Sequence, residues 1–157
     1  MSIPVLEQVR IQAQVLVPLV KALQAELGEA RANALVRNAL GDLYRKLGER
    51  WSREKAGNLG DSLAAAFDAF AAANALDYEV LEQSPEAYEI NVTSCRYAQF
   101  YKELGAPELG FLLVCSADFP MAEGFGPGVK LTRTQTMMQG ASHCDFRYAL
   151  KKSGEGV

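Results

Sequence analysis

The sequence has little positive charge and lacks a long hydrophobic run. Its 157 residues include 16 lysines and arginines against 19 aspartates and glutamates, so the formal net charge is -3 and the pI is near 5.2. This balance argues against general nucleic-acid binding, which needs a basic face to displace phosphate counterions. No window reaches the length of a membrane span, and the N-terminus lacks the basic segment and apolar core of a signal peptide. We therefore expect a soluble cytoplasmic protein that binds neither nucleic acid nor membrane.

Histidine and cysteine are also scarce, being limited to His143, Cys95, Cys115 and Cys144. An odd number of cysteines without a CxxC pair favours reduced thiols over a disulfide framework. Three thiolates together with His143 or Asp118 would satisfy a tetrahedral zinc ion, but ligands on separate elements without a short chelating pair are a weak signal. We expect no cofactor, and the alternative is a zinc ion bound by Cys95, Cys115 and Cys144.

Apolar residues make up 49% of the composition, enough for one domain over residues 1–157 with a sizeable core. Their spacing predicts a helical scaffold over about residues 3–76. The first helix has Pro4 in its first turn, is capped by Ser2 and ends at Gly28, and Pro18 should kink or break it. Its wide buried face would include Ile11, Val15 and Leu19.

Two more helices complete the predicted scaffold, over about residues 29–54 and 63–76, the latter capped by Asp61 or Ser62. Residues 77–152 form the sheet-containing half, because apolar Tyr88, Ile90 and Val92 alternate with polar residues as in a half-buried strand. Short helices are predicted over residues 94–104 and 107–115. The strands predicted over residues 129–138 and 143–151 make a C-terminal hairpin.

The segment between these helices and the hairpin, residues 121–130, holds three glycines and a proline within five residues and is predicted to be an irregular loop. Helices first, followed by strands mixed with short helices, indicate an α+β fold. The N-terminal helices would pack on an antiparallel sheet, with short intervening helices and a C-terminal β-hairpin.

The cysteines are the first candidates for chemistry. Cys95 is predicted to start a helix, where the positive helix end lowers a thiol pKa. Cys115 ends an apolar run and comes three residues before Asp118, at the edge of the glycine-rich segment, where catalytic groups are often supported. The alternative for each thiol, Cys144 included, is a small buried hydrophobic residue, which is the commonest role of a free cysteine.

Three polar residues are further candidates. Arg133 lies in a predicted strand and either extends outward or pairs with an anion such as a substrate carboxylate. Asn91 is either a solvated strand residue or an amide directed into a site. His143 is a turn residue whose near-neutral pKa also permits proton transfer.

The C-terminal half resembles a known family over roughly residues 88–148. This part of the chain combines N-x3-C, LG-x-PELG, C-x2-D, a loop with P-G, an arginine-bearing strand and G-x3-C-D-F-R. The combination resembles the L-2-amino-thiazoline-4-carboxylic acid hydrolase family. The final hairpin is also similar to that of 4-vinyl reductase-like ligand-binding domains. The matching residues are Asn91, Cys95, Phe100, Gly105, Pro107, Cys115, Asp118, Pro127, Arg133, Gly140, Cys144 and Phe146.

The resemblance implies a hydrolase that opens a small cyclic amidine or amide-like carboxylate. In the named reaction the C2 carbon of an aminothiazoline carboxylate is attacked, the ring C–S bond opens and an N-carbamoyl cysteine results. As a hypothesis, Cys115 is the nucleophile or positions water, and Asp118 is the general acid and base. The implied substrate-binding residues are Arg133 as carboxylate clamp, Asn91 at the amidine, and Cys95, Cys144 and His143 in the site.

The rival hypothesis is a non-catalytic small-molecule-binding or sensor domain, with zinc bound by cysteine as an option. A sensor predicts a mostly apolar pocket, whereas an enzyme predicts a wetter pocket on which Asp118 and Arg133 converge. A homodimer through the N-terminal helices is a further expectation.

Overall fold

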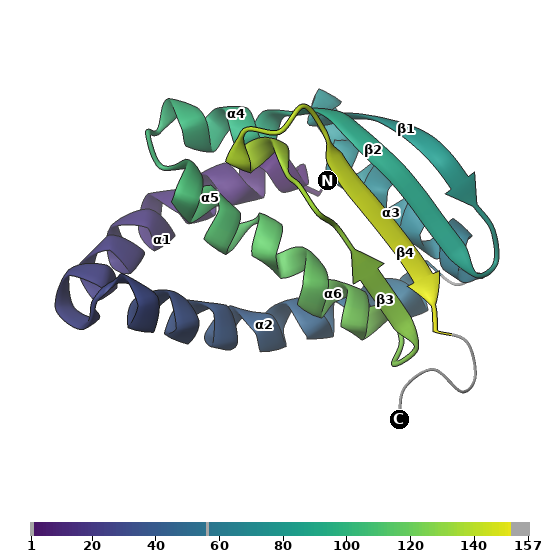
Figure 1. The fold of residues 1–157 in the computed structure, drawn as a ribbon, viewed down its shortest axis with the longest axis horizontal. Helices are drawn as coiled ribbons and strands as arrows, with labels where there is room; N and C mark the ends of the chain where they lie inside the picture. The colour runs from purple at the N-terminus through teal and green to yellow at the C-terminus, as the bar shows by residue number, and fades with distance from the viewer. Residues whose placement is uncertain (1, 56, 152–157) are drawn as a thin grey trace.

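A computed structural model of the protein describes residues 2–55 and 57–151, and it opens with two long helices (Figure 1). Helix α1 spans Val5–Leu27 and helix α2 spans Glu29–Glu54, the range predicted for the second helix. They form a helical hairpin whose junction is Gly28, at a φ of 83° that favours glycine. The expected end of the first helix at Gly28 is thus confirmed.

Three expectations for α1 are wrong. The residue before the helix is Pro4 and it provides no side-chain cap, so Ser2 does not cap α1. The predicted break at Pro18 does not occur, because the helix continues through Pro18, which lies on its exposed side. Because α1 has a neighbour on one side only, its buried face is narrower than predicted, and the exposed apolar residues are Ile11, Val15 and Leu19.

Helix α3 spans Leu59–Ala71 and begins earlier than predicted. Its cap is Asn58, whose side chain accepts a hydrogen bond from the Asp61 backbone N–H, so neither Asp61 nor Ser62 caps it. The helix also ends earlier, because a 3-10 turn follows and Ala73 and Asn74 adopt positive φ angles. The chain then enters the sheet.

The sheet has four strands in the order β1-β2-β4-β3, and every neighbouring pair is antiparallel. The strands are β1 Leu76–Gln83, β2 Ala87–Cys95, β3 Val129–Thr132 and β4 Cys144–Leu150. Strand β3 ends six residues before the predicted end at residue 138. The Thr134 and Gln135 backbone N–H groups bind the Asp145 carboxylate instead of continuing the ladder, and a 3-10 turn, Met137–Gln139, follows.

Three short helices connect β2 to β3: α4 Arg96–Glu103, α5 Pro107–Leu113 and α6 Asp118–Phe125. The last one corrects the prediction of an irregular loop. Gly124 allows α6 to approach α2 closely, since an added Cβ would lie 2.1 Å from the Arg45 carbonyl oxygen. Gly48 of α2 is the reciprocal contact, since an added Cβ there would lie 2.1 Å from the Met121 carbonyl oxygen. These glycines therefore serve a helix crossing, and only the Pro127–Gly128 turn is irregular.

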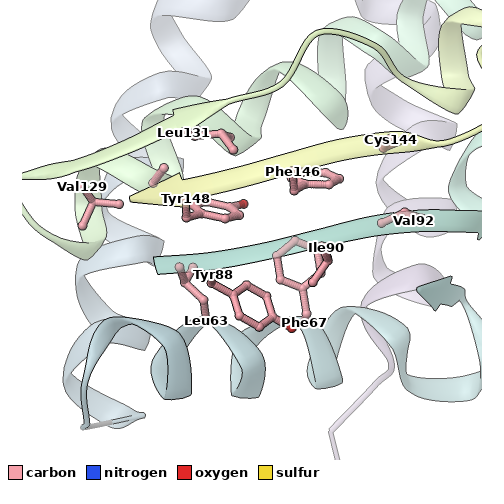
Figure 2. Close-up of a cluster of buried hydrophobic side chains, with 11 residues drawn as sticks. Leu63, Phe67, Tyr88, Ile90, Val92, Val129, Leu131, Cys144, Phe146 and Tyr148 are labelled. Carbon is pink, nitrogen blue, oxygen red and sulfur yellow. The ribbon is translucent and has the colours of Figure 1, made fainter. Parts of the chain in front are cut away.

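The main core lies on the inner face of the sheet. Figure 2 shows Leu63 and Phe67 of α3 against alternate residues of β2 and β4, including Ile90 and Phe146. A second apolar cluster joins α1 and α2 to α4 and α5. The α+β prediction is confirmed, with N-terminal helices on an antiparallel sheet, short intervening helices and a C-terminal hairpin.

Within residues 2–55 and 57–151, no helix has both the length and the apolar character needed to cross a membrane.

Candidate functional site

A cavity of about 180 Å³ lies between the helices and the inner face of the sheet. Its walls are formed by residues from α1, α2, α3, β1, β2 and the short helices. Most of these residues are apolar. Among the described residues that line it, only Asp118 and Arg133 carry charge. The formal charge at this cavity therefore lies on these two side chains.

Asp118 and Arg133 form an ion pair at the cavity wall. Asp118 is the first residue of α6, and Arg133 follows directly after β3. The Arg133 Nη1 atom donates to Asp118 Oδ2 at 2.5 Å and to the Cys115 carbonyl oxygen at 3.1 Å. The Arg133 side chain is only 3% exposed, and the Asp118 side chain is 23% exposed. Glu123, the other acidic residue of α6, pairs with Arg45.

The rest of the Arg133 guanidinium has aromatic neighbours and one free edge. Its central carbon lies 5.0 Å from the centre of the Phe119 ring and 5.4 Å from that of Phe146. Within the described chain, neither Nε nor Nη2 donates a hydrogen bond to a protein atom. An arginine presents Nε and Nη2 as a parallel pair of donors that matches the two oxygens of a carboxylate. Both nitrogen atoms keep accessible surface, so this edge can bind an anionic ligand.

Burial raises the pKa of Asp118 from 3.8 to about 6. The Arg133 charge and its hydrogen bond act in the opposite direction but do not cancel the loss of solvation. The second carboxylate oxygen, Oδ1, has no hydrogen bond to another described residue. Asp118 also provides no side-chain cap at the start of α6. A carboxyl group with a pKa near 6 exchanges protons readily at neutral pH.

All three cysteines line the cavity, but none of them has the environment of a stabilised thiolate. Burial is the main cause that raises the pKa of each thiol, to about 11 for Cys95 and well above the ordinary value for Cys115. The expectation of a lowered pKa at Cys95 is wrong. Its sulfur does accept the Ala98 backbone N–H at 3.4 Å at the start of α4, yet desolvation outweighs that hydrogen bond.

The zinc alternative gains no support from the geometry. Across residues 2–55 and 57–151, no group of three histidine, cysteine, aspartate or glutamate side chains is placed to hold a metal ion. The cysteines come from three different places, since Cys95 ends β2, Cys115 begins a 3-10 turn and Cys144 begins β4.

Two predicted site residues lie apart from the cavity. Asn91 is on the outer face of β2, because its neighbours Ile90 and Val92 face inward; it donates to Glu79 and accepts from Arg147. His143 lies in the turn before β4, where its Nδ1 atom is 2.9 Å from the Ser142 hydroxyl. The structure therefore brings together Cys95, Cys115, Asp118, Arg133 and Cys144, and leaves out Asn91 and His143.

The sequence reading missed Asp145, which holds the chain that carries Arg133. Its Oδ1 atom accepts the backbone N–H groups of Thr134 at 2.9 Å and Gln135 at 3.0 Å, and its Oδ2 atom accepts the Thr134 hydroxyl at 2.5 Å. The signal was a carboxylate within a strand, between the inward-facing residues Cys144 and Phe146. A carboxylate there needs local donors, and the loop after Arg133 supplies them.

Together, the helix-covered sheet and the cavity with one buried acid–arginine pair define an α+β protein with an internal cavity. The family model described as L-2-amino-thiazoline-4-carboxylic acid hydrolase matches residues 8–148. The chain belongs to this family, and the match includes the helical half as well as the motif-bearing half. No curated protein matches the sequence.

Proposed function

We propose that this protein is a hydrolase that opens a small cyclic amidine or amide-like carboxylate, such as 2-aminothiazoline-4-carboxylate. The observation that carries the proposal is the buried Asp118–Arg133 pair, which supplies one proton-exchanging group and one anion-binding edge in otherwise apolar walls. Membership in a family named for this hydrolysis supports the reaction type.

Arg133 is assigned to the substrate carboxylate. Its Nη1 atom is occupied by Asp118 and the Cys115 carbonyl, so the Nε and Nη2 edge is the part left for a ligand. A bidentate contact fixes the orientation of the substrate as well as its charge. The ring is then held beside Asp118, whose Oδ1 atom is available to its nitrogen atoms.

The reaction adds one water molecule across the ring. A nucleophile attacks the C2 carbon, the C2–S bond breaks, the sulfur leaves as a thiol after taking a proton, and C2 becomes the carbonyl carbon of an N-carbamoyl group. We assign Asp118 to take the proton of the attacking group and to return it to the leaving sulfur. Its raised pKa suits both steps, because the carboxyl changes protonation state near neutral pH.

Cys115 is assigned either to position the attacking water or to attack C2 itself. In the second case water then breaks the bond between Cys115 Sγ and C2, supplies the carbonyl oxygen and returns the thiol. The raised pKa of Cys115 means that the resting thiol is neutral, so attack by sulfur requires a base to remove the proton. Asp118 is the charged group nearest in sequence and the second-largest influence on that pKa. Cys95 and Cys144 are assigned to the cavity wall.

The test is ring opening by the purified protein. Incubation with 2-aminothiazoline-4-carboxylate should release a free thiol, measured with a thiol reagent, and mass spectrometry should show the gain of one water. Asp118→Asn and Cys115→Ala should each lower the rate, while His143→Ala, outside the cavity, should not. Full turnover by both cavity variants would contradict the mechanism, and retained turnover by Cys115→Ala alone would assign the attack to water.

A second candidate is non-catalytic binding of a small carboxylate, and the apolar character of the cavity walls favours it. In that case Arg133 would anchor the ligand and Asp118 would only pair with Arg133. Binding of the aminothiazoline carboxylate without thiol release, under conditions where the protein is folded, would favour this candidate.

A further inference from the structure

Uncharged polar side chains also line the cavity, besides the ion pair and the cysteines. Among the described residues they are Gln8, Gln12, Tyr44, Tyr97, Tyr101 and Thr136. Gln8 and Gln12 are exposed on α1, so their amides are in contact with solvent. Thr136 is buried, but its hydroxyl donates to Gln139 Oε1 at 2.9 Å and accepts the Gln139 backbone N–H at 3.2 Å. The three tyrosines are therefore the buried hydroxyl groups left for a ligand.

The tyrosines differ in how their hydroxyl groups are used. Tyr44 donates to the Leu113 carbonyl at 3.2 Å, and Tyr97 donates to the Phe70 carbonyl at 2.8 Å. Tyr101 is only 1% exposed, yet its hydroxyl forms no hydrogen bond with any other residue that the structure describes. Its oxygen atom keeps accessible surface, and we place this surface in the cavity that Tyr101 lines.

The ring of Tyr101 is held firmly at its base. Tyr101 lies on α4 and packs across Gly110 of α5, where an added Cβ would lie 2.6 Å from Tyr101 Cγ. The same ring belongs to the buried cluster that joins α1 and α2 to α4 and α5. The hydroxyl, at the far end of this fixed ring, is therefore in place before a ligand arrives, which lowers the cost of binding.

The surroundings of the hydroxyl place it beside Cys115. Burial, Tyr44 and Cys115, in this order of size, raise the pKa of Tyr101 to about 12, so the phenol stays neutral. Burial also raises the pKa of Tyr44, but there the charge of Asp118 contributes, as it does not for Tyr101. Cys115 is in turn joined to the ion pair through its carbonyl, which accepts Arg133 Nη1 at 3.1 Å. Along the wall, the ion pair, Cys115 and Tyr101 follow one another.

The proposed substrate has its polar groups in the same order. In 2-aminothiazoline-4-carboxylate, C4 carries the carboxylate, while C2 lies across the ring and carries the amino group outside it. With the carboxylate on Arg133 and C2 beside Cys115, the amino group is directed to the wall beyond Cys115, where Tyr101 lies. A neutral phenol can accept from an amino group or donate to a carbonyl oxygen at that position.

We propose that the Tyr101 hydroxyl forms a hydrogen bond with the polar group that C2 carries outside the ring. Tyr101 is thus a substrate-binding residue in addition to Arg133. The inference rests on the proposed function for the orientation of the substrate. It narrows the substrate class to cyclic carboxylates with an amino or oxo group at the reacting carbon, because a ring with only hydrogen there leaves the buried hydroxyl without a partner.

Two ring compounds test the inference without any turnover. 2-Oxothiazolidine-4-carboxylate has an oxygen atom on C2, and thiazolidine-4-carboxylate has only hydrogen there. Each is titrated into the wild-type protein and into Tyr101→Phe, and binding is followed by calorimetry or ligand-observed NMR. Tyr101→Phe should weaken binding of the oxo compound about fivefold, through the loss of one hydrogen bond, and leave binding of the other within about twofold.

Tyr97→Phe is the matched control. Tyr97 lies on the same helix and lines the same cavity, but its hydroxyl is used by the Phe70 carbonyl. Its replacement should leave both affinities within about twofold and lower the unfolding temperature, because a hydrogen bond within the protein is lost. Tyr101→Phe should not lower the unfolding temperature, since it removes no hydrogen bond between described residues. Thermal unfolding therefore separates a ligand-binding hydroxyl from a structural one.

The outcomes separate the inference from the proposed function. Unchanged affinity for the oxo compound in folded Tyr101→Phe, or equal weakening for both compounds, would overturn the inference, as would failure of the oxo compound to bind the wild-type protein. Selective weakening in a protein that opens no aminothiazoline ring would support the inference and count against the hydrolase. Ring opening at the wild-type kcat/KM by Tyr101→Phe would overturn the inference and leave the hydrolase standing.

Discussion

Two arginines of the C-terminal hairpin, Arg133 just after β3 and Arg147 within β4, differ in how many of their donors have protein partners. Arg147, on the outer face of β4, is 30% exposed and uses its donors within the protein. Its Nη1 atom donates to the Ile90 and Phe146 carbonyls, and its Nη2 atom donates to Asn91. Arg133 is 3% exposed, yet only its Nη1 atom is hydrogen bonded among the described residues.

The difference separates an arginine whose donors are used within the protein from one whose donors remain open. Burial alone would give Arg133 the stronger need for partners, since an unpaired buried charge is costly. The more exposed arginine nevertheless has the fuller set of protein partners. The unfilled edge of Arg133 at the cavity wall is therefore the feature that supports the proposed carboxylate contact.

The largest effect is expected for Asp118→Asn compared with Glu89→Gln. Removing the proposed general acid and base should lower kcat by about 10²–10⁴-fold. In the wild type, the rate of attack should rise with pH through about 6, where Asp118 loses its proton, and the variant should lack this step. Steady-state rates of thiol release from pH 4.5 to 8.5 provide the measurement. Glu89, which lies near Arg147 on the outer face, should be replaceable within about twofold.

Arg133→Gln should be next in size, with Arg147→Gln as its counterpart. Loss of a buried anion-binding charge should lower kcat/KM by about 10²–10³-fold, mainly through KM. Arg147→Gln should leave KM nearly unchanged and affect only stability, by about 1 kcal/mol for the lost hydrogen bonds. Similar KM values for Arg133→Gln and Arg147→Gln would contradict the assignment of Arg133 to the substrate carboxylate.

The pH dependence of the free energy of unfolding should also distinguish Asp118 at the cavity from Glu89 on the outer face of the sheet. Because folding raises the pKa of Asp118 from 3.8 to about 6, the folded protein binds this proton more tightly than the unfolded chain. The raised pKa of Asp118 therefore adds about 3 kcal/mol to the free energy of unfolding below pH 4. This contribution is lost as the pH rises to about 6. Denaturant titrations should show this slope in wild type and in Glu89→Gln, but not in Asp118→Asn.

The smallest effect is expected at Asp145, which acts on Arg133 through the chain. Asp145→Ala removes the acceptor of three hydrogen bonds from Thr134 and Gln135 and should raise KM about tenfold with little change in kcat. Asp145→Asn keeps an acceptor oxygen and should recover most of the loss. Asp77→Ala, an exposed carboxylate on β1, is the control. A purely structural role would lower stability in Asp145→Ala while leaving KM unchanged.

Much of the scaffold could be predicted from the sequence because apolar spacing and chain-breaking residues act locally. Helix α2 was predicted over its full range, since Gly28 sets its start and a regular apolar stripe runs to Glu54. The grouping of Cys115, Asp118 and Arg133 around one cavity was also anticipated by the motif. Their chemical roles remain predictions.

The errors arose where distant contacts overrule a local rule. Gly124 suggested a loop, but α2 demands a residue without a side chain at that contact. The strand predicted beyond Thr132 gave way because Asp145 takes the N–H groups that would have continued the ladder. Asn91 was placed in the site by the motif alone, although strand alternation directs it to the outer face.

The contact between Gly48 and Gly124 has a consequence for how mutations in this protein are interpreted. A methyl group at either position would push α6 away from α2, and α6 begins with Asp118. Such a substitution would displace the acid relative to Arg133 although neither glycine lines the cavity. A screen that scores only activity would therefore report both glycines alongside Asp118 and Arg133, and a parallel screen for folding is needed to tell the two groups apart.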